Sequence, residues 1–211
     1  MNFAAKNFYH KITQTVCFVL LIHLFTLSPD VFADLAGSDH DFTGAGWGDG
    51  NICKVCHTPH NANTTVPNSP LWNHAVTTAT FTPYSSSTLN ASVGQPTGVS
   101  KLCLSCHDGT VAVDSFGGRM GTHIEGGIGT DLRDHHPVSF AYDSALAVAD
   151  GALFDPTIQP TILGGTIASD LLVAGRLECS SCHDVHNRYG NSELLKISES
   201  GSALCLTCHD M

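Results

Sequence analysis

The chain has 211 residues, including 20 glycines, 9 prolines and 13 histidines, and its formal net charge is −10. This acidic balance excludes nucleic acid and anionic membrane surfaces as expected partners. The density of glycine and proline, and the scarcity of long periodic apolar segments, predict mostly irregular coil with short α-helices and very little β-structure. Such a chain buries too little side-chain surface alone, so we expect bound groups to complete its core.

Residues 1–33 have the features of a secretory signal peptide. Lys6 and Lys11 precede an apolar run over 16–27, and Val31-Phe32-Ala33 is a plausible cleavage site. The run is short for a membrane span, and no later segment is apolar over 18 residues, so we expect no span in the mature chain. Cleavage would remove Cys17, two basic residues and one acidic residue, which leaves eight cysteines and a charge of −11 over residues 34–211.

The pattern Cys-x-x-Cys-His occurs four times in the expected mature chain. The four copies are Cys53/Cys56/His57, Cys103/Cys106/His107, Cys179/Cys182/His183 and Cys205/Cys208/His209. This pattern attaches haem c, with both thiols bonded to the haem and the histidine bound to its iron. A zinc ribbon, a redox dithiol or a disulfide scaffold would not require histidine after every second cysteine. We therefore expect four haem c groups, with these eight cysteines as covalent attachment points and these four histidines as proximal iron ligands.

The motifs form a doubled unit within one expected tetrahaem domain, residues 34–211. The first and third motifs continue as Cys-x-x-Cys-His-x-x-His-Asn, whereas the second and fourth follow Ser-x-Leu-Cys-Leu-x-Cys-His-Asp. The two motif pairs span 53–108 and 179–210. Four prolines interrupt the connector 62–100, and short helices are predicted at 143–149, 166–175 and 192–198.

Seven further histidines are available as distal iron ligands: His40, His60, His74, His123, His135, His136 and His186. His60 and His186 each follow a proximal histidine by three residues. Such a pair would share one face of a helical turn, so the second histidine is expected to bind a neighbouring haem. One of His135 and His136 is expected to be a ligand, and Pro137 favours His136 by holding it extended. His74 and His40 are the remaining candidates for distal iron ligands. Methionine could also bind the iron, but Met120 and Met211 lack a supporting sequence context.

Two imidazoles on each iron predict low-spin haems of low potential with no open coordination position. The expected function is therefore electron transfer by an electron carrier, not an enzyme. A multihaem reductase would need an iron with a vacant position, and often basic residues around its substrate. Every motif here keeps its histidine, and the sequence has no cluster of arginine and lysine.

The doubled motifs, together with His40-Asp41-Phe42, Leu71-Trp72-Asn73-His74 and residues 135–140, resemble doubled-CXXCH multihaem c-type cytochromes. More narrowly, they resemble the OmcE-type tetrahaem extracellular filament cytochromes, or nanowires. The resemblance implies that the polypeptide wraps one continuous haem stack and that subunits polymerise into conducting filaments. It also implies that a histidine of one subunit binds a haem of the next. His60 is the first candidate for that ligand, and His40 is the second.

The resemblance places the protein outside the cell or at the cell surface. The implied partners are further copies of the chain, periplasmic or outer-membrane redox cytochromes, and external electron acceptors. The alternative is a soluble periplasmic tetrahaem shuttle, which shares every haem argument and differs only in not polymerising.

Overall fold

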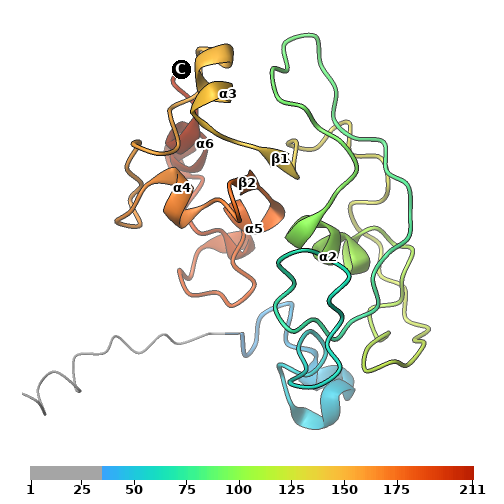
Figure 1. Ribbon diagram of the computed structural model, residues 1–211. Coiled ribbons are helices and arrows are strands. Elements are labelled where there is room, and N and C mark those ends of the chain that lie inside the picture. The colour runs from blue at the N-terminus through green and yellow to red at the C-terminus, as the bar shows by residue number, and fades with distance from the viewer. Residues whose placement is uncertain (1–34) are drawn as a thin grey trace, which may run out of the picture. The chain divides into compact units, whose positions relative to one another are not determined.

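The computed structural model describes residues 35–211, so the expected signal peptide and Cys17 lie outside the described residues. Irregular chain joins short elements in this part (Figure 1). The helices are α2 (Gly98–His107), α3 (Ser144–Asp150), α4 (Ile167–Asp170), α5 (Cys179–Cys182) and α6 (Ala203–Cys208). The strands are β1 (Phe140–Ala141) and β2 (Arg176–Leu177), and the 3-10 turns are η1 (Phe42–Ala45), η2 (Trp47–Gly50), η3 (Ser192–Leu194) and η4 (Ser200–Ser202). The prediction of mostly coil, short helices and very little sheet is confirmed.

Three of the four Cys-x-x-Cys-His motifs lie on helices: the second on α2, the third on α5 and the fourth on α6. Residues three apart share a helix face, so each cysteine pair presents both thiols to one side. In the first motif, which lies in turns, the His57 N–H donates to the Cys53 carbonyl over 2.8 Å. The corresponding bond recurs in the third and fourth motifs at 3.0 Å. The spacing of the motif therefore produces one repeated local geometry.

The helices between the motifs are bounded by caps that the sequence supplies. Asp143 precedes α3 and accepts a hydrogen bond from the Leu146 N–H over 2.9 Å, while Gly151 ends the helix in the left-handed conformation. Thr166 caps α4 in the same way through the Ser169 N–H. These caps satisfy backbone groups that a short helix leaves unpaired.

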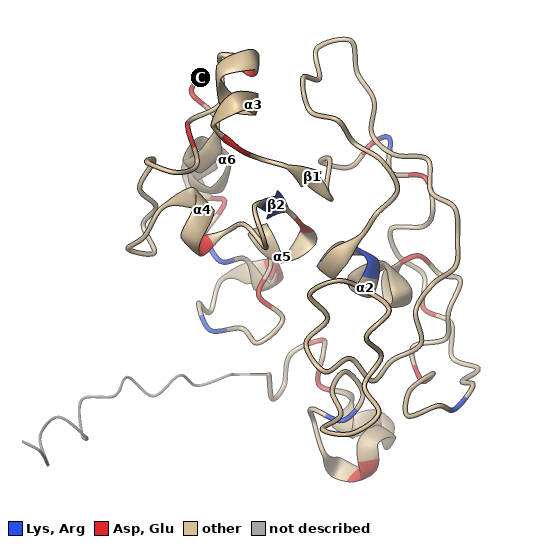
Figure 2. Ribbon diagram, viewed as in Figure 1, with Lys and Arg blue, Asp and Glu red and all other residues tan. Residues whose placement is uncertain are grey.

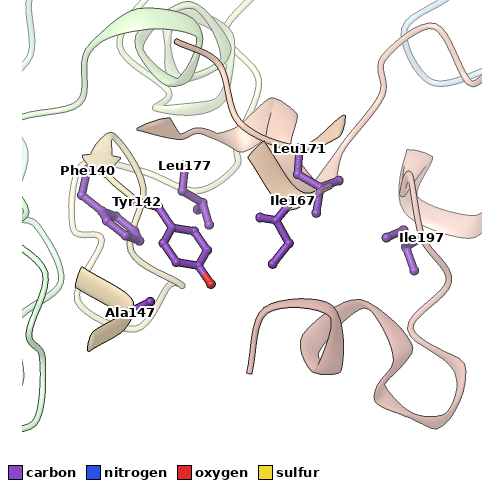
Figure 3. Packing of buried hydrophobic residues seen from close by; sticks show 7 residues of the cluster. All are labelled: Phe140, Tyr142, Ala147, Ile167, Leu171, Leu177 and Ile197. Carbon is purple, nitrogen blue, oxygen red and sulfur yellow. The ribbon is translucent and has the colours of Figure 1, made fainter. Parts of the chain in front are cut away.

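The two strands form a small antiparallel sheet, in which Phe140 pairs with Leu177 and Ala141 with Arg176. Beside it lies the larger apolar cluster, shown in Figure 3. Its buried members are Phe140, Tyr142, Ala147, Ile167, Leu171, Leu177 and Ile197. The Tyr142 hydroxyl donates to the Phe154 carbonyl over 2.7 Å, and burial raises the pKa of Tyr142. Cys208 of the fourth motif packs against this cluster.

A second, smaller cluster consists of Phe81, Leu104 and Leu132. Leu104 lies on α2 between the two cysteines of the second motif, and it is almost completely buried. The apolar side of α2 therefore holds the second motif to the connector that precedes it and to the segment that follows it.

The predicted helices are partly correct. The helix at 143–149 is present one residue later, as α3. The helix predicted over 166–175 is present only as Ile167–Asp170, and it could not have continued to 175, because Ala174 and Gly175 adopt positive φ angles of 50° and 75°. The helix at 192–198 is wrong: η3 is a single turn, and Glu193 and Leu194 both have φ of 55°. The sequence analysis also missed α2.

Acidic residues occur along much of the described ribbon, and basic residues occur at fewer positions (Figure 2). Of the described basic residues, Arg133 and Arg188 are each paired with an aspartate. None of the helices in residues 35–211 is long and apolar enough to cross a membrane.

Candidate functional site

All eight cysteines of the described chain are free thiols, so none is consumed by a disulfide within it. Cys53 and Cys205 are exposed, and the other six are half-buried. In a c-type cytochrome, each of these sulfur atoms would form a thioether bond to a carbon of a haem vinyl group. All eight sulfur atoms are therefore available for such bonds.

The thiols of successive motifs lie close to one another. Burial raises the pKa of Cys106 to about 12, and the nearby Cys56 of the first motif raises it further. The Cys103 thiol of the second motif is hydrogen-bonded to Cys179 of the third, which holds the pKa of Cys103 well above its ordinary value. The first, second and third motifs are thus linked in the order of the chain.

The link continues from the third motif to the fourth. Burial raises the pKa of Cys208 to about 12, and the neighbouring Cys182 adds to the effect. The neighbouring Cys205 also contributes to raising the pKa of Cys182. The four attachment segments therefore follow one another in space as they do in the sequence.

Three of the four motif histidines face a second histidine across a similar gap. The ring centres lie 6.2 Å apart for His57 and His186, 5.9 Å for His107 and His40, and 6.4 Å for His209 and His136. Two imidazoles that bind opposite sides of one metal ion through bonds of about 2 Å place their ring centres about 6 Å apart. Each histidine pair therefore fits one iron bound between two imidazoles.

Backbone carbonyls orient several of these rings through Nδ1. The contacts are 2.6 Å from His57 to Pro70, 2.8 Å from His183 to Glu193, and 2.9 Å from His136 to Pro137. A ring that donates from Nδ1 to a carbonyl has its lone pair on Nε2, and metal-bound histidines usually make such a bond. The chain thus holds these three imidazoles in the tautomer that an iron requires.

Burial lowers the pKa of His40, His107 and His136, with a further contribution from neighbouring imidazoles. A lower pKa favours the neutral ring, which is the form that binds a metal. His40 also has its Nδ1 buried without a hydrogen-bond partner among the described residues. His40 therefore lacks the Nδ1–carbonyl bond that orients His57, His183 and His136, and its candidacy as a ligand rests on its ring contact with His107.

The segment around His40 is held by Asp41. The carboxylate of Asp41 accepts hydrogen bonds from the backbone N–H groups of Gly37 and Thr43, at 2.9 and 3.1 Å, and so caps η1. These bonds fold the N-terminal segment into a tight turn, which brings His40 against His107.

His74 lies in a different environment from the paired histidines. It is 2 % exposed, and its ring nitrogens lie 2.7 Å from the Ala75 carbonyl oxygen and 3.1 Å from that of Ala112. Its Nε2 is 3.6 Å from the Cys106 sulfur. Within the described chain no ring contact joins His74 to a motif histidine. The structure therefore places His74 beside a thiol of the second motif.

His60 and His183 have no comparable ring pair among residues 35–211. Both are exposed, although His183 is close enough to His40 and His107 to lower the pKa of each. The backbone after His57 and His183 is not helical, so the expected placement of the histidine three residues later on a shared helical face is wrong. His186 pairs across the motif units instead.

The two remaining histidines have acidic neighbours. His123 lies 2.7 Å from Glu125, and His135 lies 3.5 Å from Asp134. All four of these side chains are at least two-fifths exposed, so these contacts are ordinary surface interactions.

Three buried acids were given no role in the sequence analysis: Asp108, Asp184 and Glu178. Asp184 directly follows His183, accepts a hydrogen bond from Arg188 Nε over 2.8 Å, and lies 3.6 Å from His186 Nδ1. Burial acts to raise its pKa, but the bonds from Arg188 outweigh that effect and lower it. The available signal was the recurrence of Cys-His-Asp in the second, third and fourth motifs.

Residues 172–211 match the protein family described as the doubled CXXCH motif. The matched segment contains α5, α6 and the third and fourth motifs. No curated protein matches the chain. Paired CXXCH motifs imply covalently bound haem c, as in multihaem c-type cytochromes, and indicate an electron-transfer role.

Proposed function

We propose that this protein is a tetrahaem electron carrier in which each Cys-x-x-Cys-His motif binds one haem c. The observation that supports this most strongly is the set of three histidine pairs whose ring centres are 5.9–6.4 Å apart. Each pair joins a motif histidine to one outside any motif. Such pairs match the requirement of an iron held by two imidazoles.

The chain's own residues bind and orient the haems. Each cysteine pair would form two thioether bonds to a haem, and in three motifs the motif histidine and its partner histidine would bind the iron. The carbonyls of Pro70, Glu193 and Pro137 fix the rings of three of these histidines. The haem supplies reversible one-electron oxidation and reduction. The mutual effects of the thiols of successive motifs on their pKa values support a relay in the order first, second, third and fourth.

An iron held by two imidazoles has no position for a substrate, which favours a carrier over a multihaem reductase. Three of the seven described basic residues are also paired with aspartates, which reduces the positive charge open to an anionic substrate. Lys54 is paired with Asp49, Arg133 with Asp131 and Arg188 with Asp184.

We further propose that the protein is exported and polymerises into an electron-conducting filament outside the cell. Three motif histidines have a partner within the chain, whereas His183 and His60 are both exposed and unpaired by a second ring in the described part. In the filament, His60 of one copy would bind the iron held by His183 of the next. Periplasmic or outer-membrane cytochromes would supply electrons, and external acceptors would receive them. A soluble periplasmic shuttle is the alternative.

Low-temperature EPR of the oxidised protein tests both proposals. In dissociated, dilute protein we expect three irons to be low-spin and one, held by His183, to be high-spin. At high concentration the fourth iron should become low-spin, because assembly supplies its second imidazole. His60→Ala should keep that iron high-spin at every concentration. His123→Ala is the matched control, since His123 is exposed and paired with Glu125, and it should behave as the parent does.

The other outcomes are distinct. Four low-spin irons at every dilution would contradict the filament and favour the soluble shuttle. A high-spin iron that persists in concentrated parent protein would contradict the pure relay and favour a reductase.

A further inference from the structure

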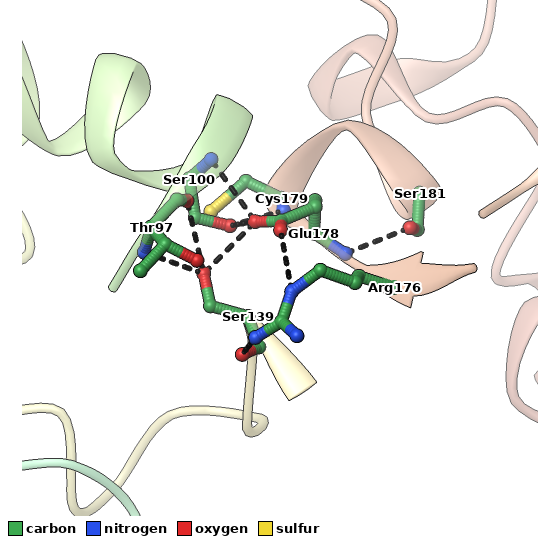
Figure 4. Close-up of polar contacts among 7 residues, drawn as sticks. All are labelled: Thr97, Ser100, Ser139, Arg176, Glu178, Cys179 and Ser181. Atoms are coloured by element: carbon green, nitrogen blue, oxygen red, sulfur yellow. Dashed lines mark hydrogen bonds and ion pairs between the residues drawn. The ribbon is translucent and has the colours of Figure 1, made fainter. Parts of the chain in front are cut away.

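Glu178 is a buried carboxylate directly before the third motif, and Figure 4 shows it between α2 and α5. Its side chain is 2 % exposed. Burying a charged group is costly unless hydrogen bonds and a counter-charge replace its water. The contacts of Glu178 therefore indicate what it holds together.

Three hydrogen bonds converge on one oxygen of this carboxylate. Oε2 accepts from the backbone N–H of Ser100 over 3.2 Å, from the Ser100 hydroxyl, and from the Ser139 hydroxyl over 2.9 Å. The other oxygen, Oε1, lies 3.6 Å from Nε of Arg176. Ser100 and Ser139 are themselves buried, so the carboxylate is enclosed by its partners.

Glu178 also caps the helix of the second motif. Thr97, at the N-cap position of α2, makes no side-chain bond to the helix, and Ser100 is the third residue of the helix. The carboxylate thus satisfies a free N–H at the positive end of a helix that is distant in sequence. Gly98 has a φ of 52°, and a Cβ there would lie 3.0 Å from Oε1, so glycine permits this close approach.

The same group of residues joins the two attachment helices. The Ser100 hydroxyl accepts a hydrogen bond from the Cys179 N–H over 2.9 Å while it donates to Glu178. The Cys103 and Cys179 side chains, one from each attachment helix, lie close to each other beside this group. Ser139 accepts from the Thr97 N–H over 3.1 Å, which ties the segment before β1 to the start of α2.

We propose that Glu178 is a positioning residue that fixes the second haem site against the third. We also propose that its negative charge lowers the reduction potentials of those two haems. This inference rests on the proposed tetrahaem function. Reduction adds an electron to each haem, and a buried negative charge beside two sites opposes that addition. The first and fourth haems, attached outside this cluster, should be affected much less.

Spectroelectrochemical titration of the mature, haem-loaded protein tests the proposal. Glu178→Gln removes the charge and nearly preserves the shape, so two of the four midpoint potentials should shift upwards. Arg176→Gln removes the opposing positive charge, and the same two potentials should shift downwards. Ser139→Ala is the matched control, because it deletes one hydrogen bond to the carboxylate and keeps the charge. It should lower the unfolding temperature and leave all four potentials in place.

Haem content, measured by intact mass, separates failure of this inference from failure of the proposed function. Parent protein with fewer than four haems would refute the tetrahaem proposal itself. Tetrahaem Glu178→Gln with unchanged potentials, or with four equal shifts, would overturn the role of Glu178. If Glu178→Gln does not fold, Arg176→Gln decides: an upward shift or no shift overturns the inference.

Discussion

Replacing His136 with alanine is expected to change the iron held by His209 from low spin to high spin. The two rings lie 6.4 Å apart, and burial lowers the pKa of His136, so it is available as a neutral ligand. Without it that iron retains one imidazole, which raises its potential and opens a coordination position. In concentrated, assembled protein, where all four irons are expected to be low-spin, about one quarter of the low-spin EPR signal should be lost.

The neighbouring residue supplies the matched control. His135 is adjacent in sequence, but it lies beside Asp134, and among the described residues it has no ring contact with a motif histidine. His135→Ala should therefore leave the EPR spectrum unchanged. If His135→Ala produces the high-spin iron and His136→Ala does not, the assignment of this ligand is wrong.

Removing the covalent haem should abolish the fold. The described chain has only two buried apolar clusters, and long irregular segments join them. Ordinary domains are stable by about 5–15 kcal/mol, and a chain with so little core depends on its cofactors for that margin. Replacing all eight motif cysteines with alanine should eliminate the cooperative thermal transition in circular dichroism. A variant lacking only Cys53 and Cys56 should retain a cooperative transition at a lower temperature.

One result of this unfolding experiment would contradict the prediction. A variant without any attachment cysteine that still unfolds cooperatively, near the temperature of the parent, would show that the polypeptide supports the fold alone. The haems would then bind to a structure that the polypeptide forms without them.

The attachment residues follow from the sequence because Cys-x-x-Cys-His is a local pattern whose spacing sets its geometry. The distal partners are different. His40 and His107 are 67 positions apart, and only the turn capped by Asp41 brings them to 5.9 Å. His186 was expected to bind a haem other than that of its own motif, and the structure places it 6.2 Å from His57 of the other motif pair, a neighbour that the local pattern does not specify.

Helix α2 and the buried Glu178 were both missed in the sequence analysis for the same reason: they stabilise each other across a long separation in sequence. Helix α2 begins at a glycine and contains two serines and two cysteines, so local propensity does not favour it. Its first turn is completed by Glu178, which lies 78 residues beyond Ser100. A glutamate beside a motif looks like a surface charge in the sequence, and only the folded chain surrounds it with donors. The helix predicted at 192–198 is absent for a local reason, since Glu193 and Leu194 both adopt a positive φ of 55°.

The central claim, one haem on every motif, is tested most directly by mass spectrometry of the exported, mature protein. Proteolysis should yield four haem-bearing peptides, which contain Cys53/Cys56, Cys103/Cys106, Cys179/Cys182 and Cys205/Cys208. The intact mass should correspond to the chain plus four haems. A fully matured protein in which any of these pairs remains as free thiols would contradict the tetrahaem relay.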